Sequence, residues 1–383
     1  MQGYEAGPGV EKGPRLAWVC TYTPEELIQA AGLVPYRLGA LTCRPRQAAA
    51  WLPPDFCSYA LALAEEAFLA EGYRLVGAVL ANSCQAMLHL YNLWSRIRPQ
   101  DAVYLLEVPR QSGEEAVTYF AAALRELWQQ LVVRFSVEVP EEKLEQAIRI
   151  YREARVLVRR LLVLRRHHPP PLNGIQIAEV LALAARTSKD RFVSWLADRL
   201  PFWEEAARQG RIVSGQPLPG TSTEPGPKAG STRVLLTGCV APTSLIASLE
   251  EHGVTVVADD LCSGGRYLVE GEEPTYSSAD PFPYLARAYL KRPPCPRMVQ
   301  GEERWKELIR LVREYRAQGV IYFSLKFCDY HHYAFPLLRQ RLRAEGIPLL
   351  RLEGEYHSPP GGQVSTRVQA FVEALGVRGE VTG

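Results

Sequence analysis

The sequence carries almost no net charge. Its 44 lysines and arginines are nearly balanced by 42 aspartates and glutamates, which leaves a formal charge of +2. Because no basic run with interleaved aromatic residues occurs, the charge pattern gives no support to nucleic-acid binding. No stretch approaches the roughly 18 apolar residues of a membrane span, and the Gly/Pro-rich start from Met1 to Pro14 lacks the apolar centre of a signal peptide. We therefore expect a cytoplasmic protein with no membrane or nucleic-acid partner.

Two common motifs are also missing. Structural zinc sites usually draw on paired CxxC knuckles, and the sequence contains none. The segment Gly226-Pro-Lys-Ala-Gly-Ser-Thr232 is the nearest approach to a phosphate loop, but its lysine is misplaced and it precedes a strand-like run instead of following one. Any dependence on ATP must therefore come from a partner protein.

The apolar pattern predicts an α/β protein. A chain of 383 residues with 47% hydrophobic and 22% charged residues is expected to form two or three soluble domains. Short β-branched runs alternate with longer amphipathic stretches, as in parallel sheets covered by helices. We expect two Rossmann- or flavodoxin-like domains. The predicted divisions are an N-terminal α/β domain, a helical segment that completes it, a Gly/Pro/Ser/Thr-rich linker and a C-terminal α/β domain, at residues 1–140, 141–210, 211–232 and 233–383.

The sequence contains eight cysteines, which is many for a reducing compartment where disulfides are rare. They are Cys20, Cys43, Cys57, Cys84, Cys239, Cys262, Cys295 and Cys328. Five of them (Cys20, Cys84, Cys239, Cys262 and Cys328) end or closely follow a strand-like run. Since the carboxyl ends of parallel strands line one crevice, we expect thiols from both halves to meet in a cleft between the domains.

Three interpretations of these thiols compete. Four of the five strand-end cysteines lie near the start of a helix, where the helix dipole is expected to lower the thiol pKa and favour the iron-binding thiolate. An iron–sulfur cluster with scattered ligands is favoured over inert core thiols, which would fall along strand interiors. Structural zinc ranks third.

Several motifs then follow in order along nearly the whole chain. The first half contains Cys20-Thr-Tyr-Thr-Pro-Glu-Glu-Leu, Ala30-Ala-Gly-Leu-Val-Pro35, Leu52-Pro-Pro-Asp-Phe-Cys57-Ser-Tyr and Asn82-Ser-Cys84. The second half contains Asp259-Asp-Leu-Cys-Ser-Gly-Gly-Arg-Tyr267, Lys326-Phe-Cys-Asp-Tyr-His331 and Arg351-Leu-Glu-Gly-Glu-Tyr356, with Gln363, Arg367 and Phe371. Together they resemble the 2-hydroxyacyl-CoA dehydratase and benzoyl-CoA reductase superfamily, in particular a dehydratase D-component subunit.

The resemblance implies a catalytic 4Fe-4S cluster in the interdomain cleft, held by Cys57, Cys84 and Cys328. With three protein ligands, one iron keeps an open position. The implied reaction is low-potential one-electron chemistry on an acyl-CoA thioester through a ketyl radical. The implied partners are a separate ATP-hydrolysing iron–sulfur activator and a second subunit, either a paralogue or an identical chain.

Two alternatives stay open. Cys20, Cys43, Cys239, Cys262 and Cys295 resemble positions in the double-cubane cluster proteins, homodimeric reductases of small molecules in which six cysteines hold an 8Fe-9S cluster. We count Cys20, Cys43, Cys262 and Cys295 as further candidate metal ligands, whereas Cys239 also recurs in single-cluster members, as a packed thiol would. The second alternative is a non-catalytic cluster or scaffold subunit of a dehydratase heterodimer.

Three other side chains are candidate catalytic residues. Ser83 is placed to donate a hydrogen bond to a cluster sulfur. His331 follows a candidate ligand closely enough to donate to a cluster or a substrate carbonyl, although a surface position is equally compatible. Glu353 follows the last strand, where it is expected either to carry protons or to pair with an arginine. By charge type alone, Arg266 is expected to steer a CoA phosphate.

Overall fold

The computed structural model describes residues 11, 13–39, 45–213, 230–268, 280–299, 301–358 and 361–381. Cys43 and most of the predicted linker lie outside the described residues. No described helix is long and apolar enough to cross a membrane.

The first half forms a parallel four-stranded sheet in the order β2-β1-β3-β4. Its strands are β1 (Arg15–Trp18), β2 (Val34–Arg37), β3 (Leu75–Ala81) and β4 (Ala102–Leu106). The connections contain α1 (Glu25–Ala30), the short helices η1 (Ala48–Ala50) and η2 (Ala70–Tyr73), α2 (Ser58–Phe68) and α3 (Gln85–Ile97). Alternating strands and helices thus produce the expected parallel sheet.

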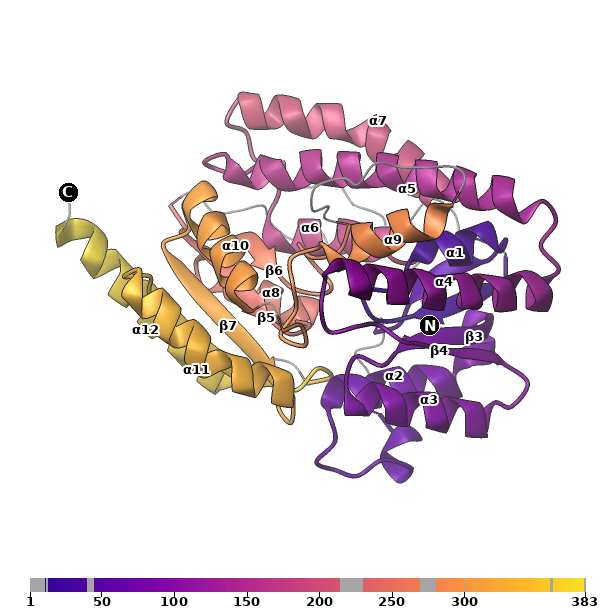
Figure 1. The fold of residues 1–383 in the computed structure, drawn as a ribbon. Helices are drawn as coiled ribbons and strands as arrows, with labels where there is room; N and C mark the ends of the chain where they lie inside the picture. Colours follow the sequence, from indigo (N-terminus) through magenta and orange to yellow (C-terminus); the bar gives the residue numbers. More distant parts are fainter. Residues whose placement is uncertain are drawn as a thin grey trace.

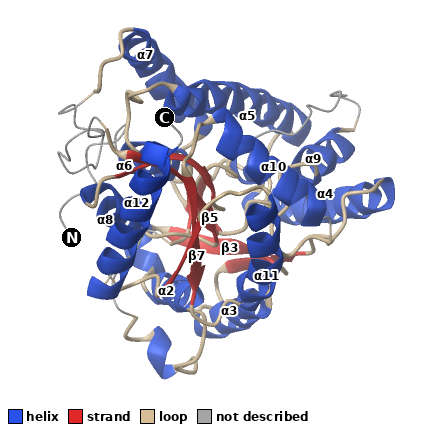
Figure 2. Ribbon diagram, turned by 90° about the vertical axis from the view of Figure 1, so that its left-hand side faces the viewer, coloured by secondary structure: helices blue, strands red, loops and turns tan. Residues whose placement is uncertain are grey.

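The second half repeats the same topology, with the strand order β6-β5-β7-β8. Its strands are β5 (Thr232–Gly238), β6 (Val254–Asp260), β7 (Gly319–Leu325) and β8 (Leu349–Gly354), and its helices are α8 (Thr243–Glu251), α10 (Gly301–Glu314), α11 (Asp329–Ala344) and α12 (Gly362–Val381). Figure 2 shows the strands of one sheet running steeply across those of the other. The prediction of two parallel-sheet domains is confirmed.

A helical layer follows the first sheet in the chain. It consists of α4 (Glu114–Phe135), α5 (Pro140–Val163), the short η3 (Leu164–Arg166), α6 (Gly174–Ala184) and α7 (Lys189–Arg208). Helix α4 packs against β4, α5 packs against α1 and α7, and α6 packs against β6 and α8 of the second half. Helix α9 (Pro281–Leu290) belongs to the second half of the sequence but packs against α4, as Figure 1 shows. Its apolar side chains share one core with the first half, so the two halves are interlocked.

Buried ion pairs fasten this layer to α1. Arg155 on α5 donates to Glu26 at 2.8 Å, and Tyr289 on α9 donates to the other carboxylate oxygen at 2.6 Å. Lys189 on α7 pairs with Glu25 at 3.0 Å, and Tyr267 donates to the same carboxylate at 3.1 Å. Because charges buried this deeply are tolerated only with good partners, these contacts hold α1 in one position.

A second junction joins the helical layer to the second sheet. The amide of Gly174 at the start of α6 donates to Glu250 Oε1 at 2.6 Å. A side chain at Gly174 would not fit, because its Cβ would lie 2.8 Å from Val256 Cβ. The close approach buries Glu250, and burial raises the pKa of its carboxyl group to about 7.

We predict that Glu250→Gln flattens the pH dependence of stability between about pH 4.5 and 7. The native Glu250 binds a proton more tightly than the unfolded one, so its contribution is complete below the unfolded pKa and falls as the pH rises through the folded pKa. The expected change is of the order of 3 kcal/mol in the wild type. Denaturant unfolding at several pH values measures it, with the exposed neighbour Glu251→Gln as control. A wild-type slope retained in Glu250→Gln would show that another group causes it.

Candidate functional site

Cysteines follow the two central strands of each sheet. Cys20 and Cys84 come after the neighbouring strands β1 and β3, and Cys239 and Cys328 come after the neighbours β5 and β7. In both sheets the strand order reverses between these two strands, which opens a crevice at their carboxyl ends. The shared topology thus brings thiols from both halves toward one another.

The first thiol group consists of Cys57, Cys84 and Cys328. Each is the N-cap residue of a helix: Cys57 of α2, Cys84 of α3 and Cys328 of α11. The charge on Cys328 contributes to raising the pKa of both other thiols, so the three lie near one another. Free N–H groups in the first turn of a helix favour negative charge beside them. The group therefore presents three thiols to one place, each backed by a helix N-terminus.

The expectation that helix starts lower the pKa of these thiols is wrong for most of them. Burial raises the pKa of Cys57 to about 12 and also raises that of Cys84, because removal from water outweighs the first-turn N–H groups. Burial likewise raises the pKa of Cys20 and Cys239. Cys328 differs, because its pKa is lowered, chiefly by the hydrogen bond that the Cys239 thiol donates to it. A metal centre would have to displace protons from most of these thiols.

Cys239 lies beside Cys328 and is fixed in place by the backbone. Its Sγ accepts a hydrogen bond from the Leu325 amide at 3.2 Å and is completely enclosed by the second core. Gly238 before it has φ 133°, and a Cβ there would lie 1.8 Å from Phe323 O, so the chain passes too close to β7 for a side chain. This placement favours the interpretation of Cys239 as a packed thiol. Its role is to donate a hydrogen bond to Cys328.

A second thiol group consists of Cys20, Cys262 and Cys295. Burial raises the pKa of Cys20 to about 12, and the charges of Cys295 and Cys262 raise it further. The charge of Cys262 likewise raises the pKa of Cys295, so the three thiols are neighbours of one another. Arg266 Nη2 donates to Cys262 Sγ at 3.3 Å. The structure thus divides six of the seven described cysteines into two groups of three, a division that the strand-end pattern did not reveal.

Arg297 connects the two groups and was missed by the sequence analysis. It follows Cys295 by two residues, and its Nη2 donates to Asn82 Oδ1 at 3.1 Å, two residues before Cys84. Its Nη1 donates to Pro109 O at 2.9 Å. The positive charge of Arg297 acts to lower the pKa of Cys20 and of Cys84, against the larger rise that burial causes. Arg297 lies near both groups because of the fold, which the sequence pattern does not reveal. Its position two residues after Cys295 was the one feature of the sequence that could have marked it as a candidate.

The three candidate catalytic side chains occupy different surroundings. Ser83 is half-buried directly before Cys84. His331 is buried, and its Nδ1 lies 3.0 Å from the Tyr322 hydroxyl. Burial, followed by the charges of nearby arginines, lowers the pKa of His331 well below its usual range and keeps the ring neutral. Glu353 is partly exposed, 3.4 Å from Arg351 and 3.8 Å from His332, which favours an ion-pair role.

Arg266 faces protein groups on several sides. Its Nε lies 3.3 Å from Asp260 Oδ1, and the other Asp260 oxygen lies 3.3 Å from Arg304. Only 3% of Arg266 is exposed. The predicted CoA-steering residue is therefore an interior residue that contacts Cys262.

The thiols suit a cluster better than a single ion. Among the described residues, no three His, Cys, Asp or Glu side chains lie close enough together to bind one metal ion. A four-iron cluster differs, because each thiolate binds its own iron and the sulfurs stay apart. Three partly buried thiols at three helix N-termini have the donor chemistry that such a cluster would need.

Fold and site define a two-domain α/β protein with two groups of partly buried thiols near the ends of its parallel strands. The sequence pattern of the family "2-hydroxyglutaryl-CoA dehydratase, D-component" matches residues 20–375. The chain therefore belongs to this family, and the resemblance seen in its motifs is confirmed.

Three relatives illustrate the range of the family. The (R)-phenyllactyl-CoA dehydratase beta subunit of Clostridium sporogenes is 26% identical and covers 92% of this chain and 90% of the relative. The putative dehydratase subunit YjiM of Escherichia coli is 27% identical, covering 95% and 92%. A benzoyl-CoA reductase subunit of Thauera aromatica is 22% identical, covering 94% and 90%. Most of the length is shared, but identities this low leave the substrate open.

Proposed function

We propose that this chain is an iron–sulfur subunit of the 2-hydroxyacyl-CoA dehydratase type that works in the cytoplasm. The observation that carries the proposal is the first thiol group, in which Cys57, Cys84 and Cys328 converge from both halves on three helix N-termini. Membership of the dehydratase family supports the same assignment. The substrate class is an acyl-CoA thioester, as in the names of the relatives.

Cys57, Cys84 and Cys328 would hold a 4Fe-4S cluster, which supplies low-potential one-electron chemistry when bound. The protein's own groups prepare the site for that charge. First-turn N–H groups of α2, α3 and α11 stabilise negative sulfur, and burial of the thiols keeps water from the centre. The Cys239 thiol donates to Cys328 and so stabilises its thiolate. The site is thus arranged for an anionic, sulfur-rich group.

Two protein partners belong to this proposal. Several relatives are named as beta subunits, which supports a second subunit, either paralogous or identical. The chain has no nucleotide loop in its sequence, so an ATP-hydrolysing iron–sulfur activator would supply the electron. Neither nucleic acid nor membrane enters the proposal.

Iron and acid-labile sulfide counting after anaerobic purification tests the cluster. We expect about four irons per chain for the single site. Turnover of a panel of 2-hydroxyacyl-CoAs with activator, ATP and candidate second subunits then tests the reaction. Four irons without turnover in any combination would favour the non-catalytic scaffold subunit instead. A protein without iron would contradict the proposal.

The second thiol group favours a double-cubane reductase as a second candidate. Cys20, Cys262 and Cys295 supply three further thiols, and the charge of Arg297 acts on a thiol of each group, which supports a position of the two groups near one another. Six cysteines are the number that an 8Fe-9S cluster would need. About eight irons per chain, with about half lost in Cys262→Ala, would decide for this candidate. An unchanged count of about four in Cys262→Ala would decide for the single cluster.

A further inference from the structure

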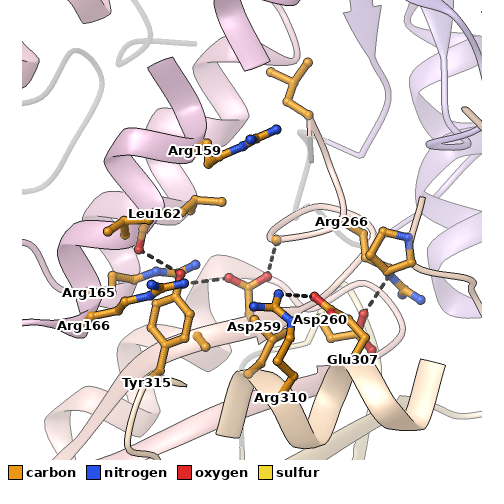
Figure 3. Close-up of a pocket in the computed structure, with 16 residues that line it drawn as sticks. Arg159, Leu162, Arg165, Arg166, Asp259, Asp260, Arg266, Glu307, Arg310 and Tyr315 are labelled. Carbon is orange, nitrogen blue, oxygen red and sulfur yellow. Dashed lines mark hydrogen bonds and ion pairs between the residues drawn. The ribbon is translucent and has the colours of Figure 1, made fainter. Parts of the chain in front are cut away.

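A cavity of about 230 Å³ lies outside both thiol groups, at the carboxyl end of β6. Its walls come from the end of α5 with η3, from the end of β6 with the following turn, and from α10. Figure 3 shows arginines around it and the two carboxylates of Asp259 and Asp260 in the middle. Ligands of parallel α/β sheets bind outside the carboxyl ends of strands, so this is a position where binding sites form.

The charge around this cavity is positive. Five arginines line it (Arg159, Arg165, Arg166, Arg266 and Arg310) against the three carboxylates of Asp259, Asp260 and Glu307. Glu314, just outside the lining, pairs with Arg166 and Arg310, and Arg310 also pairs with Glu307 at 2.6 Å, so one positive charge remains in surplus over these four carboxylates. The carboxylates of both aspartates already form ion pairs with arginines of the protein. Asp259 pairs with Arg165 at 2.9 Å, and Asp260 lies between Arg266 and Arg304. A cation would therefore meet an unfavourable field, whereas an anion would be attracted.

Two of the arginines also carry unused donors. The Nε of Arg165 and the Nη1 of Arg266 are buried and have no hydrogen-bond partner among the described residues. Each residue is only 3% exposed and lines the cavity. A buried donor without an acceptor is destabilising, so an anionic oxygen supplied here would be strongly favoured.

The remaining wall is apolar. Leu162, Val163, Leu268, Leu311 and Pro293 contribute aliphatic surface beside the arginines. An inorganic ion would leave that surface uncovered, while a larger ligand would bury it. Arginine forks match the oxygens of phosphate groups particularly well. The combination suits an organic molecule with a phosphate at one end.

We propose that this cavity binds a phosphate-bearing small molecule, either the phosphorylated nucleotide end of a coenzyme A thioester or a free nucleotide. The phosphate accepts from the unused donors of Arg165 and Arg266, and the exposed Arg159 and Arg310 add positive charge to the lining. The organic part covers the aliphatic wall. Arg266 forms a common wall between this cavity and the second thiol group, because it also donates to Cys262. The inference goes beyond the iron–sulfur role and does not require a bound cluster.

Calorimetric titration of the full-length protein at constant ionic strength tests the proposal with three probes: inorganic phosphate, coenzyme A and ADP. We expect coenzyme A or ADP to bind more tightly than inorganic phosphate. The double variant Arg159→Gln/Arg310→Gln should weaken that binding at least about tenfold, since it removes two positive charges from the lining of the cavity. Both residues are exposed on their helices, so the variant should fold normally.

The matched control is Arg160→Gln/Arg313→Gln. These arginines lie on the same two helices and pair with Glu204 and Glu345 instead of lining the cavity. The control removes the same total charge and should bind like the wild type. Binding of coenzyme A alone would assign the cavity to the substrate, and binding of ADP alone would assign it to a separate nucleotide.

Three results would overturn the proposal: no binding of any probe, equal loss in the control, or full binding in the double variant. Iron counting on the same preparation keeps the two proposals apart. Binding without iron would remove the cluster function and leave this site, while iron without binding would do the reverse.

Discussion

Replacement of Cys84 by alanine is expected to leave the protein folded and to remove most of the iron of the first thiol group. Cys84 is only partly buried and caps α3 without a side-chain hydrogen bond, so the helix loses little. Two remaining thiols cannot hold a four-iron cluster securely. Iron should fall from about four per chain to below about one, or by about half if both thiol groups are filled. Anaerobic metal and sulfide analysis measures the loss.

Cys239→Ala is the matched control for this experiment. It deletes a neighbouring thiol whose Sγ is held by the Leu325 amide and which supports Cys328 from behind. We expect it to retain its iron. Retention of iron in Cys84→Ala would remove Cys84 from the ligand set, and equal loss in Cys239→Ala would make Cys239 a ligand.

Arg155→Met is expected to lower the free energy of unfolding by about 3–5 kcal/mol. Arg155 and Glu26 are 1% and 0% exposed in their side chains and lie 2.8 Å apart. Removing the guanidinium leaves the Glu26 carboxylate buried with the Tyr289 hydroxyl as the donor that still reaches it. The cost of that uncompensated charge far exceeds the value of a surface ion pair.

Denaturant unfolding of Arg155→Met, Glu26→Leu and the double variant measures this cost. The double variant should recover much of the stability, because an apolar pair replaces the ionic one. Arg160→Met, which breaks a surface pair with Glu204, should change stability by less than about 1 kcal/mol. A loss in Arg155→Met as small as in Arg160→Met would mean that water or another cation reaches Glu26.

Much of the fold was predictable from local patterns. The alternation of strands and helices was expected from short apolar, β-branched runs separated by amphipathic stretches. Strand β2 was missed since its four residues include Pro35 and carry no alternation. Helices α2 and α9 were also missed. Neither shows a clear polar face, because α2 is almost completely buried and α9 has packed sides against α4.

The site was predictable only in its residue types. Strand ends placed the thiols at the cleft, but their division into two groups depends on the crossing of the two sheets, which no local pattern encodes. The thiol pKa values were misjudged because the helix starts were visible in the sequence and the depth of burial was not. Arg297 acquires its position through Asn82 and two backbone carbonyls of the other half. The placement of the domain boundaries remains a prediction, as do the roles of Ser83, His331 and Glu353.

The packing of α9 into the core of the first half has a consequence for synthesis of the chain. Residues such as Tyr284, Leu285 and Tyr289 fill that core, yet they leave the ribosome after the second sheet has begun. The N-terminal half therefore cannot complete its folding as an independent unit during translation, although N-terminal domains usually do so. Until about residue 290 has left the ribosome, Glu26 lacks its partner Tyr289, and the apolar side chains of α4 that α9 covers remain exposed to solvent. Chaperone dependence should accordingly end late, when α9 docks.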